Sequence, residues 1–303
     1  MIKNDTLRIA TRKSPLALWQ SEYIKSQLLK HYPQLDIQFV LLQTEGDKRL
    51  ETPLNAIGGK GLFMKELEIA IKENKADIAV HSLKDVPYQL PEGFFLASFC
   101  KRESPFDVFV SNQYTSVDSL PKGAIIGTSS LRRQAQLLNY RPDLIIKPIR
   151  GNVNTRLSKL DQGEYDGLIL AQAGLKRLNL IERIKQIIPD YLMLPAQGQG
   201  VITVECLKEN SSLINMLSAI NDRKTQAAVI AERTCNEYLQ GSCHAPIGVY
   251  ASEEGENLFL RAIVLSADGR DAIKAESLGH DPSYLGKIVA ESLLKQGAKA
   301  LLK

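Results

Sequence analysis

In the N-terminal third of the chain, short apolar runs alternate with longer segments in which apolar residues recur at helical spacing. The apolar runs at Leu7–Thr11 and Ile37–Leu42 have the length of strands, and Pro15–Lys30 between them carries apolar side chains at helical spacing. Leu62–Lys72 repeats the helical pattern, and Ala76–His81 is a further strand-length run. Strands that alternate with helices are typical of a parallel sheet covered on both faces. The pattern therefore predicts an α/β domain.

The middle of the chain repeats this alternation and predicts a second α/β domain. Its strands are expected at Ala124–Gly127, Leu144–Ile149 and Gly167–Ala171. Its helices are expected from Leu131 onward, over Val153–Leu160 and over Ala173–Leu178. Serine and threonine are preferred at helix N-termini, so the polar run that precedes Leu131 is expected to cap the first of these helices.

The last third has a different pattern, which predicts a small α+β domain. Thr225–Tyr238 is helical in spacing, and Leu258–Leu265 alternates like an antiparallel strand. A turn at residues 267–270 joins it to a hairpin partner, Ala272–Ser277. Tyr284–Leu301 is predicted to be one closing amphipathic helix.

Two segments are predicted to cross between the α/β domains. Lys101–Pro105 is polar and contains a proline, and Leu194–Gly200 is rich in glycine and leads into a strand at Val201–Glu205. The chain is thus expected to return to its first domain, with a cleft and a two-segment hinge between the halves. We expect domain 1 at residues 1–100 and 200–218, domain 2 at 101–199 and domain 3 at 219–303.

Length and composition exclude several classes of protein. The 303 residues are enough for two or three domains, and 44% hydrophobic residues supply their cores. A net charge of +4 and an aromatic content of 6% argue against a nucleic-acid binder. No apolar run reaches the roughly 18 residues of a membrane span, and the N-terminus does not resemble a signal peptide. We therefore expect a cytoplasmic protein that has reduced thiols and binds neither membrane nor nucleic acid.

Arginines gather after the predicted strands. Ligands of open α/β sheets bind at the carboxyl ends of the strands, near helix N-termini, and arginine binds carboxylates and phosphates there with two hydrogen bonds. Any one of these side chains could instead be an ordinary surface charge. Several at equivalent positions favour an anion site, and the arginines concerned are Arg12, Arg132, Arg133, Arg150, Arg156 and Arg177.

Lys84 and Asp85 follow the predicted strand Ala76–His81 and are expected at the same kind of edge. A carboxylate among cations can simply pair with an arginine. It can also stabilise positive charge that develops on a substrate, or transfer a proton. The spacing alone leaves both interpretations open for Asp85.

Two loops carry further candidate chemistry. Gly58–Gly61 contains Lys60 but does not match a nucleotide P-loop, so it is either a flexible loop or a flap whose lysine closes over an anion. Cys243 lies in a loop bounded by Gly241 and Pro246, whereas the other three cysteines lie in strand or helix patterns. A covalent tether for a bound group fits Cys243 better than a protease-type nucleophile, because the adjacent His244 would point away from it.

Seven segments together resemble the porphobilinogen deaminase family, also called hydroxymethylbilane synthases, in the family's order and over essentially the whole chain. They are Arg8–Gln20, Gly58–Phe63, Ala79–Pro87, Gly127–Gln134, Arg150–Arg156, Pro195–Gly200 and Gly241–Gly248. The resemblance implies two domains like type II periplasmic binding proteins plus a smaller third domain. It also implies a transferase that joins four porphobilinogen molecules into the linear tetrapyrrole hydroxymethylbilane, with release of four ammonia.

The resemblance also implies roles for individual residues. Asp85 would be the catalytic carboxylate, and Cys243 would hold one covalent dipyrromethane cofactor per chain through a thioether. The cofactor would further contact Lys84, Asp85, Thr128, Ser129, Ser130, Arg132, Arg133, Arg150 and Gly151. The substrate would be bound by Arg12, Ser14, Gln20, Lys60, Phe63, Arg150, Arg156 and Arg177.

No metal is expected. We expect a monomer whose product is passed to uroporphyrinogen-III synthase in tetrapyrrole and heme biosynthesis. The alternative is a non-catalytic anion-binding module of the solute-receptor type, which the first two domains alone would fit. The expected signal peptide of such a receptor is missing, and the third domain with Cys243 would have no purpose in it.

Overall fold

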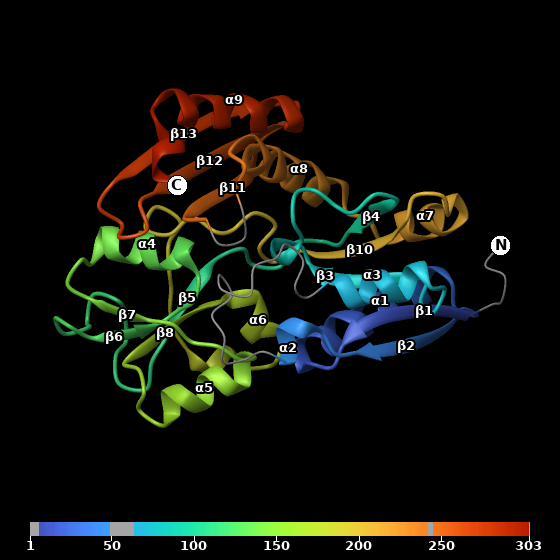
Figure 1. Cartoon of the computed structure of the whole chain (residues 1–303), viewed down its shortest axis with the longest axis horizontal. Helices are drawn as coiled ribbons and strands as arrows, with labels where there is room; N and C mark the ends of the chain where they lie inside the picture. The colour runs from blue at the N-terminus through green and yellow to red at the C-terminus, as the bar shows by residue number, and fades with distance from the viewer. Residues whose placement is uncertain (1–5, 49–63, 242–244, 303) are drawn as a thin grey trace. The chain divides into compact units, whose positions relative to one another are not determined.

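The chain folds into two compact units (Figure 1). The computed structural model describes residues 6–48, 64–241 and 245–302. Unit 1 consists of Met1–Glu103 and Val201–Gln226, and unit 2 consists of Ser104–Gly200 and Ala227–Lys303. Unit 2 holds both remaining sheets, so the division into three domains stays a prediction.

Unit 1 is built on a five-stranded mixed sheet of order β2-β1-β3-β10-β4. β1 is parallel to β2 and β3, whereas β10 is antiparallel to both β3 and β4. The strand bounds are β1 Thr6–Arg12, β2 Asp36–Leu42, β3 Ile78–Ser82, β4 Phe94–Phe99 and β10 Ile202–Leu207. The second segment of unit 1 thus supplies a strand that lies inside the sheet.

Helices cover both faces of this sheet, because successive strand residues point to opposite sides. On one face, Ile78 and Val80 pack with Ile24 and Leu28 of α1 and with Leu213 of α7. On the other, Ala10 and Ala79 pack with Leu67 and Ile71 of α3. The helical segments are α1 Pro15–His31, α2 Glu45–Lys48, α3 Lys65–Lys72, η1 Leu83–Asp85, α7 Ser211–Leu217 and η3 Ser218–Ile220.

The first sheet of unit 2 has the same plan, with the order β7-β6-β8-β5-β9. β6 is parallel to β7 and β8, and β5 is antiparallel to β8 and β9. The strand bounds are β5 Asp107–Val110, β6 Ile125–Gly127, β7 Ile145–Lys147, β8 Gly167–Ala171 and β9 Ile184–Ile187. In both sheets the strand that follows a crossing between units is antiparallel and takes the fourth place.

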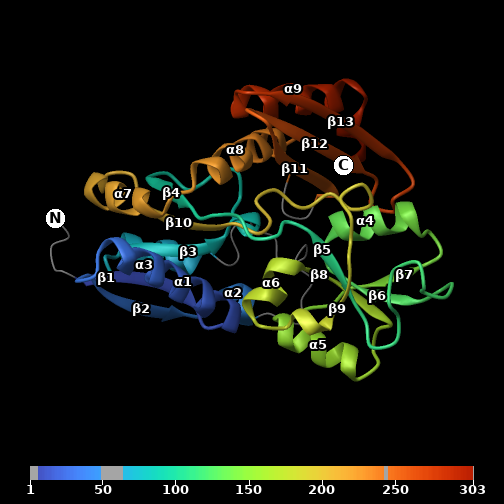
Figure 2. The same ribbon diagram turned by 180° about the vertical axis from the view of Figure 1, so that it is seen from behind.

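Helices lie on both faces of this sheet too, as Figure 2 shows for α4 on one side and α5 and α6 on the other. Leu137 of α4 belongs to the apolar cluster of one face, and Leu157 of α5 and Leu175 of α6 belong to that of the other. The helical segments are α4 Leu131–Tyr140, α5 Val153–Asp161, α6 Gln172–Arg177 and η2 Ile181–Arg183.

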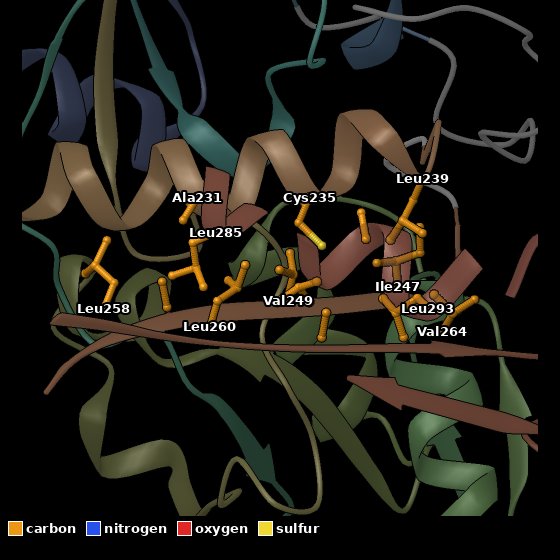
Figure 3. Packing of buried hydrophobic residues seen from close by; sticks show 14 of the residues in the cluster. Ala231, Cys235, Leu239, Ile247, Val249, Leu258, Leu260, Val264, Leu285 and Leu293 are labelled. Carbon is orange, nitrogen blue, oxygen red and sulfur yellow. The ribbon is translucent and has the colours of Figure 1, made fainter. Parts of the chain in front are cut away.

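The second sheet of unit 2 is antiparallel, with the order β11-β12-β13. Its core joins side chains of α8 and α9 to the strands, as Figure 3 shows for Ala231, Cys235, Val249, Leu260 and Leu285. The elements are β11 Ile247–Glu254, β12 Asn257–Leu265, β13 Ala272–Gly279, α8 Arg223–Tyr238, α9 Pro282–Lys295 and α10 Ala298–Leu301.

The predicted fold class, α/β sheets followed by a smaller α+β part, is confirmed by these strand orders. Two local predictions were wrong. The closing helix is broken into α9 and α10, because Gly297 between them adopts a left-handed conformation with φ of 95°. Ser130 stands at the N-cap of α4 but makes no capping hydrogen bond through its side chain.

The turn between β12 and β13 packs against α4. Gly269 in this turn has φ of 74°, and a Cβ there would lie 2.3 Å from the carbonyl oxygen of Ala135 and 2.7 Å from the amide nitrogen of Asn139. Asn139 also donates a hydrogen bond to the Gly269 carbonyl, 2.8 Å long. The second sheet of unit 2 is thereby fixed to the helix that carries Arg132 and Arg133.

A glycine substitution tests this contact. Gly255, in the turn between β11 and β12, has φ of 62° but open space at its Cβ position, so it is a matched control. Gly255→Ala should lower the free energy of unfolding by about 1–2 kcal/mol through backbone strain alone. Gly269→Ala should cost about 1–3 kcal/mol more, because the methyl group meets helix backbone that cannot move aside. Equal losses in urea denaturation of the two variants would contradict the contact.

Candidate functional site

Asp85 lies at the carboxyl edge of the unit 1 sheet. β1 and β3 are parallel, so the end of β1 at Arg12 and the turn η1 after β3 share this edge. η1 contains both Lys84 and Asp85. The Asp85 side chain is exposed and forms no hydrogen bond or ion pair with the residues that the structure describes. The predicted neighbourhood of Arg12, Lys84 and Asp85 at one sheet edge is thus present within unit 1.

Backbone hydrogen bonds and the side chain of Gln20 hold the turn that carries Asp85. The amide of Leu83, whose side chain is fully buried, donates to the carbonyl of Val201 at 3.0 Å, and the amide of Val86 closes the turn on the Leu83 carbonyl. Gln20 of α1 is buried and donates through Nε2 to the Ser82 hydroxyl at 2.7 Å. Gln20, expected to bind substrate, therefore supports the residue from which η1 begins.

Ser14 performs a structural task at the same edge. Its hydroxyl accepts the amide of Ala17 at 3.4 Å and caps α1, which begins with Pro15. A proline in the first turn needs no hydrogen-bond donor of its own, so Ser14 and Pro15 together define the start of the helix. The helix start lies next to Arg12, the last residue of β1.

The carboxyl edge of the first unit 2 sheet gathers a second group of predicted residues. The parallel strands β6, β7 and β8 end there, and Thr128–Ser130 follows β6 directly. The Ser129 hydroxyl donates to the Ile149 carbonyl at 2.7 Å and accepts the Ile149 amide at 3.0 Å. Thr128 accepts the Ser130 amide at 3.2 Å. The two bonds between Ser129 and Ile149 join the loop after β6 to the loop after β7.

Arg150, Gly151 and Arg156 lie in the loop after β7 and the first turns of α5. Arg150 is half-buried, and burial lowers the pKa of its guanidinium. Gly151 has φ of 108°, and a Cβ there would come within 2.8 Å of the Thr155 side chain. Arg156 donates through Nε to the Gly151 carbonyl at 2.9 Å. A partly desolvated cation next to a helix N-terminus is a favourable place for a carboxylate.

Arg132 and Arg133 are instead buried inside unit 2, on a single carboxylate. Arg132 Nη1 lies 2.7 Å from Asp107 Oδ2, and Arg133 Nη2 lies 2.8 Å from Asp107 Oδ1. Gln199 donates to the same carboxylate at 3.1 Å. Burial lowers the pKa of Arg132, and the negative charge of Asp107 opposes this shift.

Both arginines also donate to backbone carbonyls, Arg132 to Leu194 and Arg133 to Ile169. The sequence interpretation did not include Asp107 or Gln199. The available signal was Asp107 itself, an acidic residue at the head of the apolar run that forms β5.

Arg177 is likewise buried. Its Nη2 donates to the carbonyl of Gly200 at 2.7 Å, so it holds the end of the glycine-rich crossing segment. The structure thus separates the predicted arginines of unit 2 into two groups. Arg132, Arg133 and Arg177 hold backbone and a carboxylate in the interior, and Arg150 and Arg156 lie half-buried at the sheet edge.

Cys243, Lys60 and Phe63 lie outside the described residues. The other three cysteines, Cys100, Cys206 and Cys235, are buried. Burial raises the pKa of Cys206 to about 11 and that of Cys235 to about 12, so both thiols stay protonated and unreactive at neutral pH. In the part of the chain that the structure describes, no three potential ligand residues come together to hold a metal, and no helix has the length and apolar character of a membrane span.

Two solved structures show a distant similarity to this chain. The methionine-binding protein MetQ matches with a TM-score of 0.47 and 11% identity, covering 73% of this chain and 92% of that one. The VFT2 domain of Bordetella pertussis BvgS matches with a TM-score of 0.45 and 15% identity, covering 75% and 93%.

Comparison of sequences gives a much closer result. A porphobilinogen deaminase of Francisella tularensis subsp. novicida is 52% identical over 297 residues, covering 98% of this chain and 99% of its own length. One of F. tularensis subsp. holarctica is 51% identical with the same coverage. Residues 7–215 match the family description "Porphobilinogen deaminase, dipyromethane cofactor binding domain", and residues 226–295 match its C-terminal domain. The chain belongs to the porphobilinogen deaminase family.

Proposed function

We propose that this chain is a hydroxymethylbilane synthase that uses Asp85 as its catalytic carboxylate. The enzyme joins four porphobilinogen molecules head to tail, releases four ammonia and frees linear hydroxymethylbilane from a covalent dipyrromethane. Membership of the family over nearly the whole chain is the observation that supports the reaction. The exposed position of Asp85 on a firmly held turn supports its role. Nothing in the comparisons favours the solute-receptor alternative.

The chemistry assigned to Asp85 follows from charge. Loss of ammonia from porphobilinogen leaves an electron-poor pyrrole that carries positive charge, and a nearby carboxylate stabilises it. After the new carbon–carbon bond forms, a proton must leave the ring, and the same carboxylate can assist its removal. Because η1 is fixed by backbone bonds and by Gln20, the carboxylate needs little reorganisation at each round.

We assign the arginines to two roles: some bind the carboxylates of the pyrroles directly, and others hold the loops that carry the binding residues. Each pyrrole carries an acetate and a propionate, so negative charge accumulates as the chain grows. Arg150 and Arg156 at the unit 2 edge, with Arg12 at the unit 1 edge, are the residues we assign to direct binding of these groups. Arg132, Arg133 and Arg177 we assign to holding the loops from which the binding residues project.

We assign the covalent attachment of the dipyrromethane cofactor to Cys243. The three other cysteines are buried, and the two with raised pKa values lack thiolate character. The cofactor supplies the nucleophilic pyrrole end to which substrate is added. Within the described residues, Thr128 and Ser129 have hydroxyl groups at the unit 2 edge, and we assign to them contacts with the cofactor.

We further propose that the enzyme acts as a cytoplasmic monomer and passes its product to uroporphyrinogen-III synthase. Hydroxymethylbilane is a reactive linear molecule, so the next enzyme has to close the ring before spontaneous chemistry does. Size-exclusion chromatography with light scattering measures the oligomeric state directly.

Intact-protein mass spectrometry tests the cofactor and its attachment. The purified chain should be heavier than its sequence by one dipyrromethane, and Cys243→Ser should abolish both this excess and turnover of porphobilinogen. Cys235→Ser is the control, because a buried thiol with a pKa of about 12 is not expected to carry the group. A wild-type chain that turns over porphobilinogen at its unmodified mass would contradict the assignment.

Two arginine substitutions test whether Arg132 stabilises unit 2 while Arg150 binds the cofactor or substrate. Arg132→Gln leaves Asp107 with one buried partner fewer and should lower the free energy of unfolding by about 3–5 kcal/mol. Arg150→Gln should lower it by less than about 1 kcal/mol and instead reduce dipyrromethane occupancy or raise KM for porphobilinogen. Urea denaturation and intact mass measure the two effects. The opposite result, a stability loss only for Arg150→Gln and a binding defect only for Arg132→Gln, would contradict this assignment.

A further inference from the structure

A buried group of ionisable side chains lies directly before the turn of Asp85 and has no role in the function described so far. His81 is near the end of β3, and its Nε2 lies 2.8 Å from Oε2 of Glu205 on β10. The two side chains are 6% and 0% exposed. An imidazole and a carboxylate in contact inside a sheet–helix layer are costly unless the pair has partners or a purpose.

The packing of α3 on the sheet brings Glu68 close to this pair. His81 is opposite Thr203 and Glu205 is opposite Ala79, so His81, Ala79 and Glu205 project from one face of the sheet. That face is covered by α3, whose Leu67 packs with Ala79. Glu68, the next residue of α3, is half-buried and interacts electrostatically with both Glu205 and His81. We call Glu68, His81 and Glu205 the β3 acid cluster.

Glu205 is incompletely satisfied in this position. Its Oε2 contacts His81, but its Oε1 is buried and has no hydrogen-bond partner among the described residues. A buried carboxylate oxygen without a partner disfavours the folded state, and an apolar side chain would avoid that cost. The cluster is therefore poorly explained as a stabilising feature of the sheet.

Within this cluster, the pKa of Glu68 is raised. Burial and the charge of Glu205 raise the pKa of Glu68 to about 7, while His81 and Lys72 act in the opposite direction. Other charged residues on the elements of this layer are Glu66 of α3, Arg8 and Arg12 of β1, and Asp77 just before β3. Arg8 and Asp77 pair with each other at 2.8 Å, and Glu66 accepts the amide of Glu45.

We propose that the β3 acid cluster is a positioning group for the reaction at Asp85, and that its net negative charge behind the turn favours the cationic pyrrole. The inference rests on the proposed function. His81 is joined to Asp85 by the last residue of β3 and by η1, so the His81–Glu205 pair fixes the strand end from which the turn leaves. Ionised Glu68 adds a second carboxylate to that layer, and because Glu68 is half-buried its charge is less screened there than in water.

The pH dependence of kcat separates this role from a purely structural one. In the holoenzyme, kcat for porphobilinogen should rise as pH increases through about 7, because Glu68 loses its proton there. Glu68→Gln fixes the neutral state, so that rise should vanish and kcat should stay several-fold below the wild-type plateau. KM should be unchanged, because the cluster does not touch the substrate.

Two further variants check the sign and the specificity. Lys72 is exposed, and its cation lowers the pKa of Glu68, so Lys72→Gln should move the rise in kcat to higher pH. Glu73→Gln, at the end of α3 where Glu73 pairs with Lys75, is the matched control and should leave the profile unchanged.

A Glu68→Gln profile that keeps the wild-type rise, with or without a loss of stability, would overturn the inference. Dipyrromethane occupancy, measured by intact mass, keeps this outcome distinct from a failure of the proposed function. If the function itself is wrong, wild-type protein will carry no dipyrromethane and convert no porphobilinogen. If only the present inference is wrong, wild type and Glu68→Gln will both be loaded and active with the same pH profile.

Discussion

The functional turns of both α/β sheets depend on one antiparallel strand in each. β10 begins beside the end of β3, with Ile202 opposite Ser82, and β5 begins beside the end of β8, with Asp107 opposite Ala171. Because the two strands of each pair run in opposite directions, the entry of the crossing strand meets the carboxyl end of its neighbour. The first residues after each crossing are thereby available to hold the loops that carry chemistry. Val201 binds the turn of Asp85, and Asp107 binds Arg132 and Arg133.

In both units, some charged side chains are buried and stabilise the fold, whereas others lie at the sheet edges, where we propose that they bind or react. Arg132, which is buried on Asp107, donates through Nη1 both to that carboxylate and to the carbonyl of Leu194. The half-buried Arg150 is the cation that the proposal assigns to pyrrole carboxylates. The same contrast holds for the acids of unit 1, where Glu205 is fully buried and Asp85 is exposed. The net charge of the chain is only +4, but this sum hides local sites of opposite sign. Asp85 lies at the edge of the unit 1 sheet, and Arg150 lies at the edge of the first unit 2 sheet.

Periodicity in the sequence predicted the parallel strands and the longer helices, because their apolar residues recur regularly along the chain. Gly167–Ala171 was predicted with its observed bounds, and β1 and α1 within one residue at each end. The strands β4, β5, β9 and β11 were not predicted. β5 begins with a buried aspartate, which leaves an apolar run of only three residues. β9 alternates lysine and glutamine with isoleucine and has no continuous apolar run.

The candidate site was predictable in position but less so in detail. Strand ends identified the edges where Arg12, Asp85 and Arg150 lie. They could not reveal that Arg132 and Arg133 turn inward, because that depends on which face of α4 meets Asp107, a contact between residues far apart in the sequence. The His81–Glu205 pair was hidden for the same reason, since 124 residues separate its members.

The most direct test of the central claim is a single-turnover measurement with Asp85→Asn, which removes the charge and keeps the shape of the side chain. Asp36→Asn is its control, an exposed aspartate at the amino end of β2 in the same sheet. Asp85→Asn should carry dipyrromethane and bind porphobilinogen but release ammonia at least about a hundredfold more slowly, which is the lower range for loss of a catalytic acid–base group. Asp36→Asn should match the wild type. Ammonia release by Asp85→Asn at the wild-type rate would contradict the account.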